Sequence, residues 1–95
     1  MVQFVSGLRS AVDDDGAVIL NSTRNQITTL DAMGGYIWER LQQGMSQSEI
    51  VRHISLETGE APDVVQRDVD ELLSELQNRH LIVDPKRHPV KSDHV

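Results

Sequence analysis

The chain of 95 residues has one Trp, one Tyr, one Phe, no Cys and a formal net charge of -6. This length allows one domain with a modest aliphatic core and excludes a second, and the missing thiol excludes disulfides and Cys-based zinc sites. The longest apolar run, Ala17 to Leu20, is too short for a signal peptide or a membrane span, so we expect a soluble, cytoplasmic protein without a membrane partner.

Three short strands are predicted first. They span about Leu8 to Val12, Ala17 to Asn21 and Gln26 to Leu30, with turn-rich, hairpin-sized connections between them. The middle strand is apolar on both faces, which predicts a central strand covered on two sides. The third strand then forms an edge that carries neither Pro nor Lys, two residues that commonly protect an exposed edge from pairing.

The first predicted helix begins at the N-cap Asp31 and runs to about Gln43, before Gly44. Gly34 and Gly35 weaken its first turn, which we interpret as a device that lets the helix pass close to the sheet. Trp38, on the same helix, is expected in the core.

Two more helices follow. Ser46 and Glu49 have the spacing of a capping box at the start of the second helix. The third runs from Pro62 to about Arg79, and its apolar stripe consists of Val65, Val69, Leu72 and Leu76, widened by Leu73. This order of strands and then helices indicates an α+β fold. We expect one domain over residues 1–83 and a flexible tail over residues 84–95.

No residue set predicts catalysis or metal binding. The four His residues include no pair one helical turn apart, and Asp13 to Asp15 lack the ligand spacing of a calcium loop. There is no nucleophile motif and no phosphate-binding loop. The sequence therefore predicts no enzyme, no metal site and no cofactor.

The charge distribution argues against nucleic acid as a partner. Acidic residues are concentrated in the third helix, and duplex DNA would be repelled by the acidic surplus. The only basic cluster, Lys86 to Lys91, lies in the expected tail. A winged-helix DNA-binding regulator stays open as an alternative of a different class, because a sheet and helices of this size can bind DNA.

Several segments together resemble the PqqD-like family of peptide-recognition elements for ribosomally made, modified natural products. They are Gly16 to Leu20, Leu30 to Trp38, Ser46 to Ile50 and Val65 to Leu76. Leu30 to Trp38 is most similar to the stand-alone B1 proteins of lasso peptide pathways. The resemblance implies a winged-helix-turn-helix-like fold with a three-stranded antiparallel sheet followed by three helices.

The resemblance also implies a function. The leader of a precursor peptide would pair antiparallel with the third strand and pack against the third helix, and the chain would present it to a B2-type cysteine protease and to the cyclase of the pathway. The implied peptide-binding residues are Asn25, Gln26, Ile27, Thr28, Thr29 and Leu30 on the strand, and Val65, Asp68, Val69 and Leu72 on the helix. A basic leader residue is expected at Asp68. A PqqD-type peptide chaperone of the pyrroloquinoline quinone pathway, or of another such pathway, is the nearest alternative.

Overall fold

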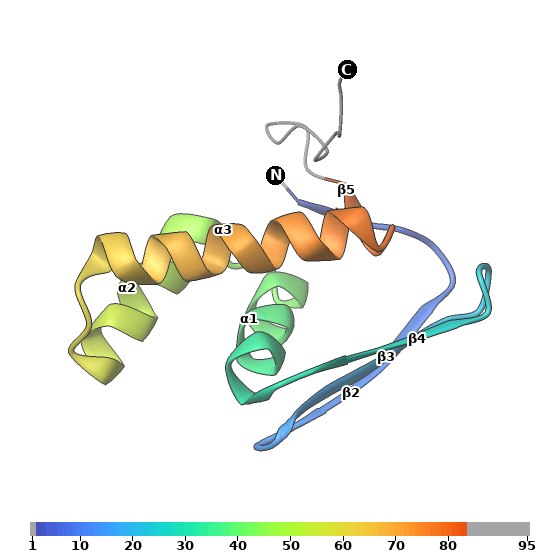
Figure 1. Ribbon diagram of the computed structural model, residues 1–95, viewed down its shortest axis with the longest axis horizontal. Helices are drawn as coiled ribbons and strands as arrows, with labels where there is room; N and C mark the ends of the chain where they lie inside the picture. The colour runs from blue at the N-terminus through green and yellow to red at the C-terminus, as the bar shows by residue number, and fades with distance from the viewer. Residues whose placement is uncertain (1, 84–95) are drawn as a thin grey trace.

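The computed structural model describes residues 2–83 and shows an α+β fold (Figure 1). An antiparallel sheet has the strand order β2-β3-β4, and three helices follow it in the chain. The elements are β2 (Leu8–Asp13), β3 (Gly16–Asn21), β4 (Gln26–Leu30), α1 (Ala32–Gln42), α2 (Gln47–Thr58) and α3 (Pro62–Asn78). The predicted fold class and all six elements are confirmed. The tail predicted over residues 84–95 lies outside the described residues.

The helices cover one face of the sheet only. On the inner face, Ala17 and Ile19 of β3 are 5% and 0% exposed. On the other face, Val18 and Leu20 are 49% and 38% exposed. The prediction that β3 is covered on two sides was therefore wrong. Apolar residues also occur on exposed faces of sheets, so a strand that is apolar on both faces need not be covered on both.

A second, two-stranded sheet was not predicted. It pairs β1 (Gln3–Phe4) with β5 (Ile82–Val83), and the Val5 N–H donates to the Leu81 carbonyl over 3.2 Å. The Phe4 ring meets the buried Trp38 edge-on, with 5.1 Å between ring centroids. The two ends of the described chain are thus joined over the core.

The junction between β4 and α1 is tightly built. The Asp31 carboxylate accepts from the Gly34 N–H over 2.8 Å, as expected of the predicted N-cap. A Cβ on Gly35 would lie 2.7 Å from the Gly16 carbonyl carbon, so only glycine allows α1 to approach β3 this closely. The indole N–H of Trp38 donates to Ser10 Oγ over 3.1 Å. These contacts fix α1 on the sheet.

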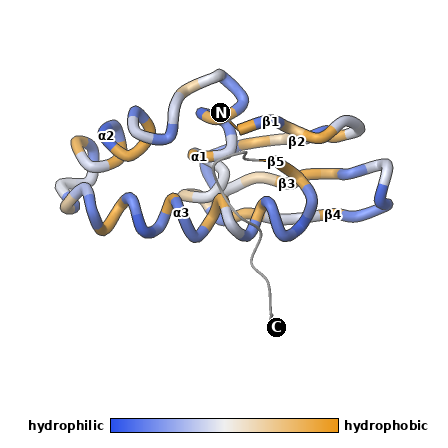
Figure 2. Tube along the Cα trace, turned by 90° about the horizontal axis from the view of Figure 1, so that it is seen from above, coloured by the Kyte–Doolittle hydropathy of each residue, from blue (hydrophilic) through white to orange (hydrophobic). Residues whose placement is uncertain are grey.

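The other two helices pack on each other and complete the core. The predicted capping box of Ser46 and Glu49 is present, and α2 ends at Gly59 with a φ of 77°. Hydrophilic and hydrophobic residues alternate along α3 (Figure 2), and its buried residues are Val65, Val69, Leu73 and Leu76. The Gln47 side chain donates to Asp70 between the two helices. No helix among residues 2–83 has the length and apolar character of a membrane span.

Candidate functional site

The candidate site begins at β4, an edge strand to which β3 alone is paired among the described residues. A two-residue turn joins β2 to β3 and is closed by the pair Asp13 and Gly16. A pair that closes such a turn exchanges backbone hydrogen bonds, and the bonding direction then alternates along the strand. Gly16 of β3 therefore bonds to β2, whereas Ala17 and Ile19 direct their backbone groups toward β4.

This alternation determines which groups of β4 are free. Thr28 and Leu30 are the partners of the β3 residues that point toward β4. The Leu30 carbonyl oxygen is indeed directed at β3, since a Cβ on Gly16 would lie 2.0 Å from it. Ile27 and Thr29 consequently turn their N–H and C=O groups away from β3. The open edge offers two donors and two acceptors in the arrangement that an extended peptide needs.

The side chains of β4 differ in exposure. Ile27 is 66% exposed on the open face of the sheet, whereas Thr28 is 2% exposed on the inner face. Within residues 2–83 the Thr28 hydroxyl has no hydrogen-bond partner. Asn25, predicted from the resemblance to belong to the pairing strand, lies instead in the turn before β4 with a φ of 52°. Whether Asn25 contributes to peptide binding stays a prediction, and the strand itself has the predicted bounds, Gln26 to Leu30.

An apolar pocket lies near the end of β4, where α1 begins. It has a volume of about 90 Å³ and is enclosed by α1, α2 and α3. Its lining residues are Met33, Ile37, Ile54, Thr58, Glu60, Val65, Asp68 and Val69. The first turn of α1 touches β4 directly, because a Cβ on Gly34 would lie 3.1 Å from the Leu30 Cβ. The pocket is therefore close to the free edge.

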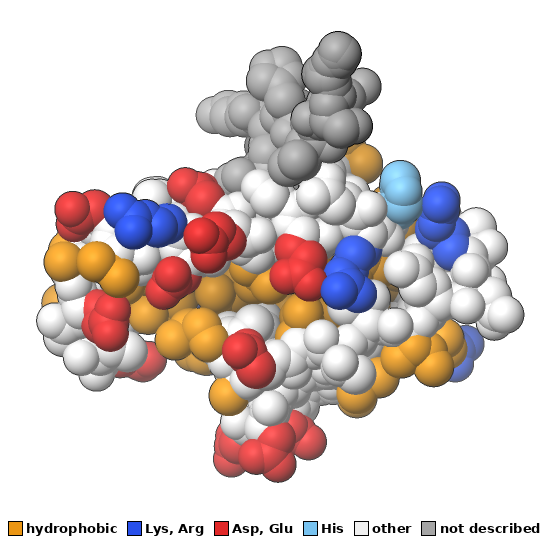
Figure 3. All heavy atoms as spheres, viewed as in Figure 1, with side chains coloured by type: hydrophobic (Ala, Val, Ile, Leu, Met, Phe, Trp, Pro, Cys, Tyr) orange, Lys and Arg blue, Asp and Glu red, His pale blue; other side chains and the backbone are white. Residues whose placement is uncertain are grey.

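The structure brings together part of the predicted helix surface. Val65, Asp68 and Val69 line the pocket, whereas Leu72 is half-buried against the core and does not line it. Hydrophobic side chains are exposed beneath the acidic side chains of α3 on the face seen in Figure 3. Figure 2 shows α3 and β4 on the same side of the molecule. The free strand edge therefore lies on the same side as α3, which carries three of the residues that line the pocket.

Sequence reasoning missed the contributions of α1 and α2 to this pocket. Met33 and Ile37 repeat at helical spacing, a pattern that indicates a core stripe as readily as a pocket. Glu60 lies in the short connection between α2 and α3. Charged residues are common in loops, so nothing in the sequence marked Glu60 as a pocket residue. Met33, which is 42% exposed, is the one apolar lining residue whose exposure marks it as accessible.

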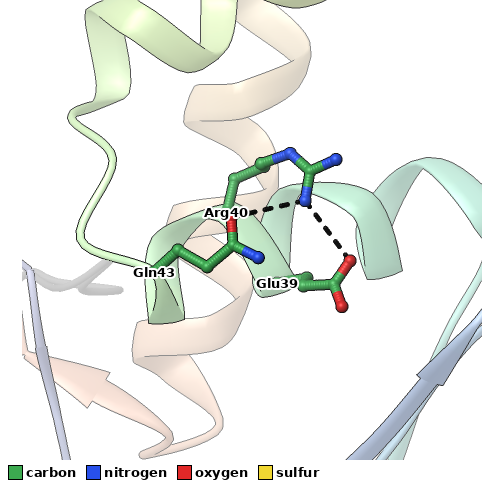
Figure 4. A network of polar contacts seen from close by, with 3 residues as sticks. All are labelled: Glu39, Arg40 and Gln43. Atoms are coloured by element: carbon green, nitrogen blue, oxygen red, sulfur yellow. Dashed lines mark hydrogen bonds and ion pairs between the residues drawn. The ribbon is translucent and has the colours of Figure 1, made fainter.

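The other polar features lie apart from this site. The Arg40 guanidinium contacts Glu39 and Gln43 over 3.4 Å each (Figure 4) and sits 4.4 Å from the centre of the Tyr36 ring. Arg40 therefore covers one face of Tyr36. A hydrogen bond from the Ser46 backbone N–H lowers the pKa of Glu49 at the start of α2. No group of three potential metal ligands occurs among residues 2–83.

Comparison with known proteins agrees with this architecture. The family model described as Coenzyme PQQ synthesis protein D (PqqD) matches residues 16–82. The solved structure of TbiB1 in complex with the TbiA(beta) leader peptide is 32% identical, with a TM-score of 0.78, over 84% of this chain and 93% of that chain. No curated protein matches significantly.

A second solved structure has the same fold. It is a lasso peptide synthetase B1 complexed with the leader peptide, at 19% identity and a TM-score of 0.79, over 87% of this chain and 98% of that chain. The family match covers most of the chain, and TbiB1 exceeds the identity at which a shared family is expected. The chain therefore belongs to the PqqD family.

Proposed function

We propose that this chain binds the leader segment of a ribosomally made precursor peptide, in the manner of a lasso peptide B1 protein, without catalysing a reaction itself. The observation that carries the proposal is the free edge of β4 beside an apolar pocket. The similarity to TbiB1, a protein solved in complex with a leader peptide, supports it. The leader pairs antiparallel with β4 and packs against α3.

The energetics assign different tasks to the strand and to the pocket. Pairing with Ile27 and Thr29 gives up to about four hydrogen bonds, each contributing about 1 kcal/mol net. Because backbone hydrogen bonds are nearly independent of the peptide's sequence, they contribute affinity but little specificity. Burying one apolar leader side chain in the pocket adds about 1.5 to 3 kcal/mol and provides the specificity for the leader sequence.

In this proposal the chain presents the bound leader to partner enzymes. The chain has no predicted catalytic residues, so cleavage and ring closure require a B2-type cysteine protease and a cyclase. The resemblance to B1 proteins supports both partners. The cytoplasmic location predicted from the sequence stays a prediction.

The alternatives differ in ligand. A peptide chaperone of the pyrroloquinoline quinone pathway would use the same edge of β4. The description of the matching family model, Coenzyme PQQ synthesis protein D, is consistent with this alternative. The precursor that binds decides between them. The DNA-binding alternative has no support in the comparisons, and α3, the helix that would enter the major groove, is rich in carboxylates.

Nuclear magnetic resonance tests the proposal directly. The isotope-labelled chain is titrated with the synthetic leader of the precursor encoded beside its gene. We expect shifts concentrated on the backbone amides of Ile27 and Thr29 and on Met33 and Val69 in the pocket. Random duplex DNA at low salt is the control and should shift nothing. Leader shifts confined to the open face of the sheet, or no binding at all, would contradict the proposal.

A further inference from the structure

Two carboxylates flank the apolar pocket. Glu60 and Asp68 are exposed and line a pocket whose other lining side chains are uncharged. Neither makes an ion pair within residues 2–83. The Glu60 backbone is held in place, since its carbonyl accepts from Ser55 Oγ over 2.6 Å and its N–H donates to Thr58 Oγ1 over 3.2 Å. The connection between α2 and α3 thus presents Glu60 at a defined position beside Asp68.

The opposite end of the site carries positive charge. Arg24 lies in the turn before β4, and Arg79 follows the last residue of α3. Arg79 pairs with Glu75 over 3.0 Å, so this pair has no net charge and Arg24 supplies the positive charge at this end. The site therefore has a negative end, near Leu30 and the pocket, and a positive end, near Gln26.

These ends correspond to the two ends of an added strand. β4 runs from Gln26 to Leu30. A peptide that pairs antiparallel with β4 places its N-terminal part beside Leu30, at the negative end, and its C-terminal part beside Gln26. A peptide bound in the parallel direction would place the same parts at the opposite ends.

We propose that the site selects leaders with Lys or Arg beside an apolar side chain at the N-terminal end of the paired segment, and that this charge preference fixes the direction of binding. The inference rests on the proposed function and names the class of leader that the site accepts. The apolar side chain fills the pocket. The aliphatic stem of Lys or Arg lies along Met33 and Val65 at the pocket while its cation meets Glu60 and Asp68.

A peptide display selection tests the preference. A library of random peptides is selected against the full chain and against the Glu60→Gln/Asp68→Asn double variant. We expect wild type to enrich a basic residue next to an apolar one, and the variant to keep only the apolar preference. The matched control, Asp63→Asn/Glu71→Gln, removes equal charge from α3 outside the pocket and should retain the basic preference.

Affinity measurements supply the magnitude. For a selected peptide, each neutralised carboxylate at the pocket should raise Kd about two- to fivefold at low salt, and less at high salt, because both groups are exposed. Equal enrichment of basic residues by wild type and the pocket double variant would overturn the inference. Equal loss in the matched control variant would also overturn it, since the effect would then follow net charge.

A spin label on the selected peptide tests the direction. A label at the peptide N-terminus should broaden the amide signals of Met33 and Val65, and a label at its C-terminus that of Gln26. The reverse pattern at β4 would overturn the inference and the antiparallel direction of pairing, but it would leave leader binding at β4 intact. Broadening remote from β4, or a library that yields no binder, would contradict the proposed function itself.

Discussion

Ile27→Pro separates peptide binding from folding at a single position. The Ile27 N–H points away from β3, so proline removes a donor that the free chain does not use. The preceding residue, Gln26, is already in a strand, the conformation that a following proline favours. The folded state loses mainly the cross-strand contact with Leu20, which amounts to about 0.2 to 1 kcal/mol.

The bound state loses more. One hydrogen bond disappears, the leader carbonyl opposite Ile27 stays unpaired, and the proline ring occupies the space of the incoming strand. Together we expect a cost of about 2 kcal/mol, which corresponds to a roughly thirtyfold increase in Kd. Fluorescence anisotropy with a labelled leader peptide measures the affinity, and urea unfolding measures the stability of the free chain.

Two variants make this experiment decisive. Ile27→Thr removes the apolar side chain but keeps the N–H, so it should bind almost as wild type does. Thr28→Pro removes an N–H that β3 does use and should lower the free energy of unfolding by about 3 kcal/mol. Wild-type affinity in a folded Ile27→Pro variant would refute strand addition at β4. An equal loss in Ile27→Thr would assign the effect to the side chain.

Three further predictions concern the scaffold. Gly35→Ala should lower the free energy of unfolding by about 1 to 2 kcal/mol in urea titrations, because a Cβ 2.7 Å from the Gly16 backbone outweighs the better helix propensity; unchanged stability would show that α1 can shift. Thr28→Val should raise the melting temperature, because it removes a buried hydroxyl without a partner at a benefit of about 1 kcal/mol; a fall would indicate that the hydroxyl is hydrogen-bonded. Glu49 has a lowered pKa in the folded chain, so its contribution to stability is complete above the ordinary value of 4.5 and is lost as the pH falls through the folded pKa. The difference in urea midpoint between wild type and Glu49→Gln should therefore shrink on acidification, and a constant difference would contradict the cap.

Local signals account for most of what could be predicted. The capping box at Ser46, the glycines after α1 and α2 and the N-cap Asp31 each act within one helical turn, so the sequence contains the whole interaction. The three strands of the main sheet were likewise bounded by turns. The two-residue strands β1 and β5 had no such signal. They exist only through their pairing with each other, and the paired residues Gln3 and Val83 are 80 positions apart in the sequence.

The candidate site also combines a part that local sequence predicts with a part that depends on long-range packing. The edge position of β4 followed from the order of the strands, and the missing Pro and Lys marked it as open. The pocket could not be predicted, because its lining comes from three helices whose relative placement depends on the packed core. Val65 and Val69 illustrate the ambiguity, since both are at most 4% exposed and line the pocket as well.

The placement of strand edge and pocket explains how a small chain can select an extended peptide. Leu30 ends β4, Asp31 caps α1, and Met33 already lines the pocket, so only two residues lie between the end of the strand and the pocket. The close approach of Gly35 to Gly16 holds this short connection against the sheet. Because the two parts cannot move independently, a peptide must satisfy the backbone edge and the pocket in one register. A peptide shifted by one residue would turn its apolar side chain to the opposite face of the sheet and lose the pocket.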